Sequence, residues 1–141
     1  MGDATLCMVA FDFGTTYSGY AYSFCSEPLK VHTNRWQAGD KTISYKTPTC
    51  VLLNKEEEFH SFGYDAENHF ASLAEDDSHQ GWLLFRHFKM SLHTNRNLSA
   101  ATTVPDINGK QMPAMDIFSM SEIFKRTSHE CCTETESRHY R

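Results

Sequence analysis

Residues 7–24 read CMVAFDFGTTYSGYAYSF, with an apolar run on each side of a Gly-Thr-Thr turn. The first run, from Leu6 to Phe13, is almost unbroken and is typical of a strand that is buried on both faces. The second run places three aromatic side chains on one face at period two, namely Tyr20, Tyr22 and Phe24. The pattern predicts a strand, a tight turn and a second strand.

Asp12 is the one carboxylate in the first run, and it stands just before the turn. Burying an ionised carboxylate is costly unless hydrogen-bond donors or a cation meet it. A carboxylate at the mouth of a buried strand therefore indicates a metal site or another binding site.

The turn residues Gly14, Thr15, Thr16 and Tyr17 suit an anion. Glycine permits positive φ and close backbone approach, so the amides from Gly14 to Tyr17 can point outward as a nest for phosphate oxygens. The two threonines add hydroxyl donors at the same rim. Taken alone, these residues also fit a plain hairpin turn.

Other phosphate-binding motifs do not describe this turn. It lacks the glycine-lysine pair of a Walker loop, and it is not a GxGxxG dinucleotide fingerprint. Residues 12–14 spell the Asp-Phe-Gly triplet of protein kinases. Only eleven residues precede them, so no His-Arg-Asp catalytic loop can lie upstream within this chain.

Several segments, in the expected order, resemble the ATPases of the superfamily that contains actin, sugar kinases and the heat shock protein 70 chaperones. Asp12–Ser18 resembles their first phosphate loop. Lys46–Thr49 is similar to the threonine-proline segment of the heat shock protein 70 chaperones, and Phe59–Ala66 to their glycine-then-alanine helix entry. The aromatic-rich segments Ser18–Phe24 and Phe85–Met90 resemble a divergent branch of that family, the heat shock 70 kDa protein 12 branch.

The resemblance, which runs from about Val9 to Phe118, implies an α/β fold. It implies part of one actin-like (ribonuclease-H-like) ATPase lobe, with a mixed sheet and flanking helices. Residues 1–126 are expected to form a partial N-terminal lobe, and residues 127–141 a disordered polar tail. The two-lobed ATPase needs a far longer chain, so we expect a fragment or short product that is not a working ATPase alone.

The resemblance also implies site residues and the cofactors ATP and Mg²⁺. The amides of Gly14, Thr15, Thr16 and Tyr17 resemble the donors to the terminal ATP phosphates. Asp12 resembles the carboxylate that holds Mg²⁺ through its water shell. Lys89 resembles, more loosely, the catalytic lysine that reaches the γ-phosphate and the attacking water.

Two alternatives stay open at this stage. A register shifted by one residue would place Phe88 at the catalytic position and leave Lys89 as a surface lysine. The resemblance implies an ATP-binding, chaperone-like protein that regulates a client or partner protein. The alternative is a non-enzymatic interaction or adaptor protein that retains the fold.

Composition excludes some partners and locations. A net charge of −5 and a pI near 5.9 argue against a nucleic-acid binder, and no apolar run approaches a membrane span. The five cysteines form no Cys-x-x-Cys pair, which favours a reducing cytoplasm. His129–Cys132 holds potential metal ligands but not a known zinc spacing.

Local patterns predict the other elements. Residues 29–33, 49–53, 59–62 and 98–104 are expected as strands, residues 34–47 as a polar loop, and residues 55–58 as a solvated turn. A period between three and four predicts a helix from Tyr64 to Glu75. Asn108-Gly109 predicts a hairpin turn, and Pro113 is well placed to open a second helix.

Overall fold

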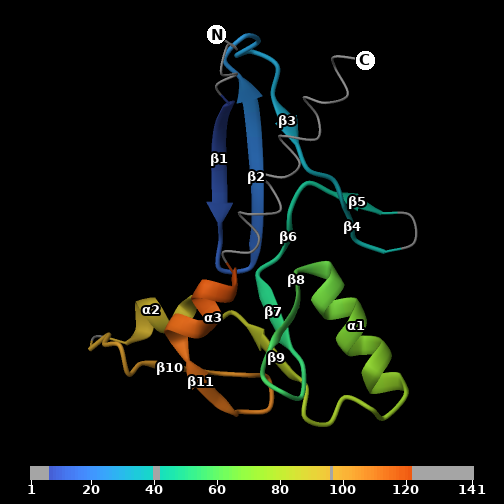
Figure 1. Cartoon of the computed structure of the whole chain (residues 1–141), viewed down its shortest axis with the longest axis vertical. Coiled ribbons are helices and arrows are strands. Elements are labelled where there is room, and N and C mark those ends of the chain that lie inside the picture. The colour runs from blue at the N-terminus through green and yellow to red at the C-terminus, as the bar shows by residue number, and fades with distance from the viewer. Residues whose placement is uncertain (1–6, 40–41, 96, 122–141) are drawn as a thin grey trace, which may run out of the picture.

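The computed structural model describes residues 7–39, 42–95 and 97–121 of the chain. Within them the fold is mixed α/β, with small sheets and short helices (Figure 1). The elements in order are β1 (Cys7–Phe13), β2 (Tyr17–Phe24), β3 (His32–Thr33), β4 (Trp36–Gln37), β5 (Ile43–Ser44), β6 (Thr47–Pro48), β7 (Cys50–Leu53), β8 (Phe59–Phe62), α1 (Tyr64–Glu75), β9 (Leu83–Arg86), α2 (Met90–Thr94), β10 (Thr103–Pro105), β11 (Gln111–Pro113) and α3 (Ala114–Ser121).

The predicted strand, turn and strand at the start of the chain is confirmed. β1 and β2 form an antiparallel hairpin in which Cys7 pairs with Phe24 and Phe13 pairs with Ser18. β3 and β6 pair with β2, which makes β2 the central strand of this sheet. The hairpin turn points toward the junction between α3 and the sheet of β7, β8 and β9 (Figure 1).

The prediction that the first strand is buried on both faces is wrong for the described residues. Met8 is 69% exposed and Phe11 is 42% exposed. A continuous apolar run is buried on both faces only where other elements cover both of them. Among the described β1 residues, it is Phe13 that joins the main core, where its ring lies beside those of Phe88 and Phe118.

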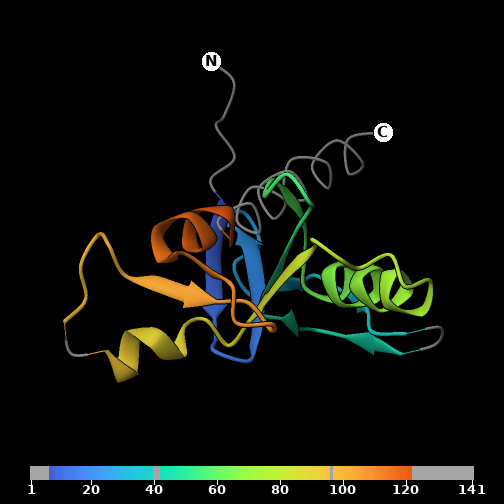
Figure 2. The ribbon, with the colours of Figure 1, turned by 90° about the horizontal axis from the view of Figure 1, so that it is seen from below.

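β7 is the strand that is buried on both faces. It is the centre of an antiparallel sheet in the order β8-β7-β9, and all four of its residues are buried. Side chains alternate along a strand, so Cys50 and Leu52 pack with Ala66 of α1 on one face. Val51 and Leu53 pack on the other face with Phe85, Val104 and Ile117. β7 therefore lies between α1 and α3, as Figures 1 and 2 show.

Several predicted boundaries agree with the structure. The helix from Tyr64 to Glu75 and the strand from Phe59 to Phe62 are confirmed. The Asn108-Gly109 turn is also confirmed: it joins β10 to β11, and Gly109 has a φ of 90°. Helix α3 begins at Ala114, just after Pro113 ends β11.

Other local predictions are corrected. The loop expected at residues 34–47 contains the paired strands β4 and β5, and the strand expected at residues 98–104 begins only at Thr103. Every strand pairing among the described residues is antiparallel, so the expected mixed sheet is not seen in them. The predicted tail at residues 127–141, including His129–Cys132, lies outside the described residues.

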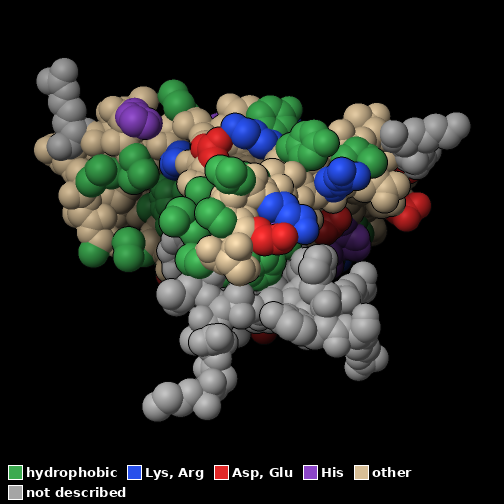
Figure 3. Space-filling view, turned by 90° about the horizontal axis from the view of Figure 1, so that it is seen from above, with side chains coloured by type: hydrophobic (Ala, Val, Ile, Leu, Met, Phe, Trp, Pro, Cys, Tyr) green, Lys and Arg blue, Asp and Glu red, His purple; other side chains and the backbone are tan. Residues whose placement is uncertain are grey.

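The surface agrees with the modest net charge. On the face seen in Figure 3, Lys and Arg side chains stand apart from one another among acidic and apolar ones. In the part of the chain that the structure describes, no helix has both the length and the apolar character that a membrane span requires.

Candidate functional site

The turn between β1 and β2 depends on a close backbone approach at Gly14. The Gly14 N–H donates a hydrogen bond to the Tyr17 carbonyl oxygen, with 3.1 Å between nitrogen and oxygen. A Cβ at Gly14 would lie only 2.3 Å from that oxygen. Gly14 does not use the positive φ that glycine permits, so the turn needs glycine because of the close backbone approach to Tyr17.

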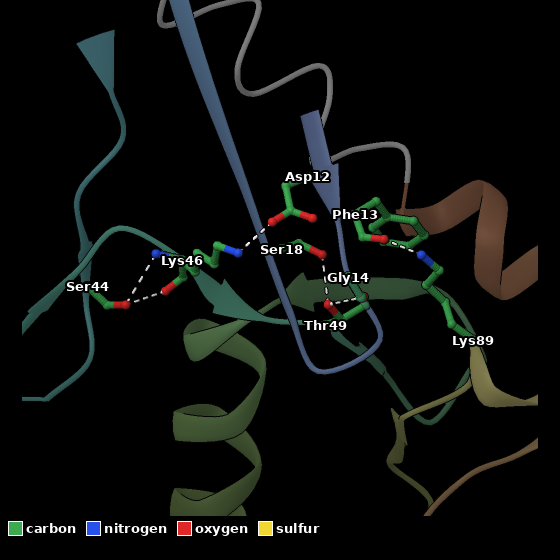
Figure 4. A network of polar contacts seen from close by, with 8 residues as sticks. All are labelled: Asp12, Phe13, Gly14, Ser18, Ser44, Lys46, Thr49 and Lys89. Atoms are coloured by element: carbon green, nitrogen blue, oxygen red, sulfur yellow. Dashed lines mark hydrogen bonds and ion pairs between the residues drawn. The ribbon is translucent and has the colours of Figure 1, made fainter. Parts of the chain in front are cut away.

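Thr49 lies between β6 and β7 and holds the turn in place by hydrogen bonds. Its hydroxyl lies 2.8 Å from the Gly14 carbonyl oxygen, to which it donates, and 2.7 Å from the Ser18 hydroxyl (Figure 4). Its backbone N–H donates to the Thr16 carbonyl oxygen at 2.8 Å. Thr49 is only 3% exposed and its bond with Ser18 is buried, so these bonds hold the turn in one conformation.

The bonds of Thr49 occupy carbonyl oxygens of the turn and leave amides available. The amides of Thr15 and Thr16 donate no hydrogen bond to any other described residue. Thr16 is exposed and Thr15 is half-buried. The Gly14 amide is used within the turn, so it is not available as one of the four expected donors, whereas those of Thr15 and Thr16 are. What remains suits a small anion at the tip of the hairpin.

The threonine-proline segment, Lys46–Thr49, also fixes the start of α1. Tyr17 pairs with Pro48, and Ser18 with Thr47. The Thr47 hydroxyl oxygen accepts the Tyr64 N–H at 3.0 Å, which satisfies one of the unpaired donors at the start of the helix. Gly63 makes this contact possible, because a Cβ there would lie 2.0 Å from the Thr47 hydroxyl oxygen. The threonine-proline segment thus links the turn to the helix entry.

Asp12 does not have the buried environment that the sequence predicted. Its side chain is 59% exposed, and its Oδ2 lies 2.5 Å from the Lys46 ammonium nitrogen. The cause is the position of β1, whose side chains near the turn are covered only in part. The carboxylate does have a cationic partner, and that partner is a lysine of the same chain.

Lys89 lies against the base of the same turn. Its ammonium donates to the Phe13 carbonyl oxygen and stands 4.5 Å from the centre of the Phe13 ring (Figure 4). Phe88 points instead into the core, where it is 3% exposed and its ring lies beside that of Phe118. Of the two residues considered for the catalytic position, Lys89 is the one whose charged group reaches the turn.

Comparison with known proteins finds relatives of this chain. The chain is 45% identical over 121 residues to Heat shock 70 kDa protein 12B of Homo sapiens, which covers 84% of this chain and 18% of that protein. It is 47% identical over 116 residues to Heat shock 70 kDa protein 12A of Homo sapiens and of Mus musculus, covering 81% of this chain and 17% of each. This chain is a relative of these heat shock proteins.

The relationship covers a small part of those relatives. The chain spans less than a fifth of the length of the Heat shock 70 kDa protein 12A and 12B chains that it matches. No protein-family model matches it, and no solved structure matches it. The relationship to these heat shock proteins is compatible with a partial actin-like lobe.

The sequence did not predict a pocket next to the turn. This pocket, of about 200 Å³, is lined by Thr16, Tyr17, Pro48, Thr49, Cys50, Tyr64, Glu67, Arg86 and His87. Arg86 and Glu67 form an ion pair in it, with 2.5 Å between nitrogen and oxygen. Burial, with a smaller effect of Glu67, raises the pKa of the Cys50 thiol to about 12, so the thiol is protonated and unreactive at neutral pH.

The described residues do not by themselves fit a Mg²⁺ site. They contain no group of three His, Cys, Asp or Glu side chains that could hold a metal ion. Asp12 is a single exposed carboxylate, and one of its oxygens already meets the Lys46 ammonium. Mg²⁺ prefers several oxygen ligands, and at nucleotide sites in general it is held together with the nucleotide phosphates.

Replacing Thr49 by Val is expected to lower stability and to weaken the nucleotide binding that the family resemblance implies. Valine keeps the volume but leaves the Gly14 carbonyl oxygen and the Ser18 hydroxyl without this partner. We expect a loss of about 1–3 kcal/mol in the free energy of unfolding, and ATP affinity lower by about tenfold. Calorimetric titration and urea unfolding measure both.

Thr49→Ser is the matched control, because it keeps the hydroxyl and removes only a methyl group. It should retain most of the affinity. If Thr49→Val loses stability and binds ATP as the unmodified protein does, Thr49 does not position the turn for binding.

Proposed function

We propose that this lobe binds the terminal phosphates of ATP, as part of an ATP-binding, chaperone-like protein of the heat shock protein 70 family. One observation supports this most strongly. The carbonyl oxygens of Phe13, Gly14 and Thr16 are held by Lys89 and Thr49, while the amides of Thr15 and Thr16 donate to no other described residue. Its relatives, Heat shock 70 kDa proteins 12A and 12B, support the family-level role.

Preorganisation is the physical reason that such a turn would bind phosphate. Successive backbone N–H groups form a concave site for an anion, and they donate charge-assisted hydrogen bonds to it. A turn that is already fastened by Thr49 and Gly14 loses little conformational entropy when the phosphate arrives. The hydroxyls of Thr15 and Thr16 would add donors at the same place.

In this proposal Lys89 is the catalytic residue for phosphoryl transfer to water. Its ammonium rests on the Phe13 carbonyl oxygen at the base of the turn, and a flexible lysine side chain can exchange this contact for one with a phosphate oxygen. A lysine there stabilises negative charge as it develops on the transferring group. Mg²⁺, when it accompanies the nucleotide, would supply further charge neutralisation. No step of the proposal depends on Asp12 holding it.

A second function is favoured by the same lysine contact. If the Lys89 ammonium stays on the Phe13 carbonyl oxygen when ATP binds, the protein keeps a nucleotide-binding fold without turnover and acts as an adaptor for a partner protein. Either function places the other wall of the nucleotide site outside these 141 residues, so the 141-residue chain alone would have no ATPase activity.

We also propose a cytoplasmic location, which suits the free Cys7, Cys25 and Cys50 thiols.

The proposed function predicts that the phosphates dominate recognition. In calorimetric titrations of the native protein, Mg-ATP should bind at least about 100-fold more tightly than adenosine, since each charge-assisted hydrogen bond contributes about 1.5–3 kcal/mol. AMP should lie between them, because it lacks the terminal phosphates. Equal affinities for Mg-ATP and adenosine would contradict a phosphate site at this turn.

A further inference from the structure

The side chain of Lys46 reaches the turn through a space that a glycine leaves open. Gly19 pairs with Asp12 across the hairpin, and a Cβ at Gly19 would lie 3.2 Å from the Lys46 Cγ. The lysine stem therefore crosses β2 over Gly19, and its ammonium meets the Asp12 carboxylate on β1 (Figure 4).

The root of this side chain is held while its charged end is exposed. The Ser44 hydroxyl donates to the Lys46 carbonyl oxygen at 2.6 Å and accepts the Lys46 N–H at 3.2 Å. The next residue, Thr47, pairs with Ser18 of β2. Yet 53% of the Lys46 side chain is exposed, so a fixed backbone carries an ammonium that solvent and ligands can reach.

We propose that Lys46 is a phosphate-binding cation of this site and occupies the place beside Asp12 where the family resemblance puts Mg²⁺. This inference rests on the proposed function, because the ligand is the phosphate group of ATP. In this structure the ammonium meets the Asp12 carboxylate. When nucleotide binds at the tip of the turn, the ammonium moves from the carboxylate to a phosphate oxygen.

The exchange is physically favourable. An ion pair between exposed side chains contributes little to stability, so opening the Lys46 to Asp12 contact costs little. A terminal phosphate carries more negative charge than a carboxylate, and lysine binds phosphate as a mobile point charge. Asp12 is two residues before Gly14, so the ammonium lies beside the strand that leads into the turn.

If Lys46 binds the phosphate, the affinity for ATP depends less on a divalent metal. A cation that belongs to the chain already offsets part of the phosphate charge, and it competes with Mg²⁺ for the Asp12 oxygen. ATP should therefore bind measurably without a divalent metal. Removing the competing carboxylate should free the lysine for the phosphate.

Calorimetric titration of the native protein with ATP, in EDTA and again with Mg²⁺, tests this. In EDTA, Lys46→Met should bind ATP at least about tenfold more weakly, and Lys46→Arg should keep most of the affinity. Asp12→Asn should bind metal-free ATP more tightly than the unmodified protein. A carboxylate whose role is to hold Mg²⁺ would instead show no change in EDTA and a loss with Mg²⁺.

Lys30→Met is the matched control. Lys30 also forms an exposed ion pair, with Glu27 at 3.2 Å and 49% and 57% side-chain exposure, and it lies in the connection after β2, away from the turn. It should leave ATP binding unchanged. If Lys46→Met and the unmodified protein bind metal-free ATP equally well, Lys46 does not bind the phosphate. The proposed function of the turn is not affected by that result. If the unmodified protein binds no ATP, with or without Mg²⁺, the proposed function fails together with this inference.

Discussion

Gly14→Val is expected to abolish ATP binding by the native protein, lowering affinity by about 100-fold or more. A Cβ at this position would lie 2.3 Å from the Tyr17 carbonyl oxygen, and that oxygen belongs to the backbone. The turn therefore has to open, which also breaks the Gly14 N–H to Tyr17 bond. Opening the turn misplaces the amides that meet the phosphates and adds bulk where the phosphates approach.

The same strain should lower stability, so binding has to be separated from folding. Ala10→Val is a suitable control, because it adds a β-branched side chain at an exposed position of the same hairpin. Circular dichroism and thermal unfolding identify conditions in which both variants are folded. Under those conditions, ATP affinity in Gly14→Val equal to that of the unmodified protein would exclude this turn as the phosphate site.

Lys89→Met is expected to lower the turnover of ATP by about 100-fold or more, while ATP affinity changes only a few-fold. A charge that acts mainly on the transition state changes kcat far more than binding. Methionine keeps an unbranched stem against the Phe13 ring, so the packing at the base of the turn is retained. Phosphate release and calorimetric titration measure the two quantities separately.

Lys110→Met is the control for loss of a surface lysine. Lys110 forms an exposed ion pair with Glu57, at 2.5 Å between nitrogen and oxygen, and it belongs to the β10–β11 connection. Its loss should not change turnover. Equal turnover in Lys89→Met and the unmodified protein would return Lys89 to a structural role, and absence of turnover in the unmodified protein would favour the adaptor function.

Elements with a strong local period could be predicted from the sequence. The helix from Tyr64 to Glu75 and the strand from Phe59 to Phe62 agree with the structure to the residue. In both, apolar spacing and the flanking residues indicate the same boundaries. The short strands β4 and β5 were missed because two-residue strands have no period to detect.

The strand that is buried on both faces was assigned to the wrong place. The runs Leu6–Phe13 and Cys50–Leu53 are both apolar, and composition does not distinguish them. In the structure α1 and α3 cover the two faces of β7, whereas parts of β1 stay exposed. A pattern along one strand contains no information about which other elements cover it.

The sequence by itself determined the hairpin, the glycine-threonine turn and the resemblance to the heat shock protein 70 family, because these depend on neighbours in the chain. Only the tertiary structure decided that Thr49 holds the turn and that Lys46 meets Asp12. It also decided that the charged group of Lys89, rather than Phe88, contacts the Phe13 carbonyl oxygen at the base of the turn. These partners are 31 to 76 residues apart in sequence. Hydrogen bonds and ion pairs act over a few ångströms, so such contacts exist only after folding brings the segments together.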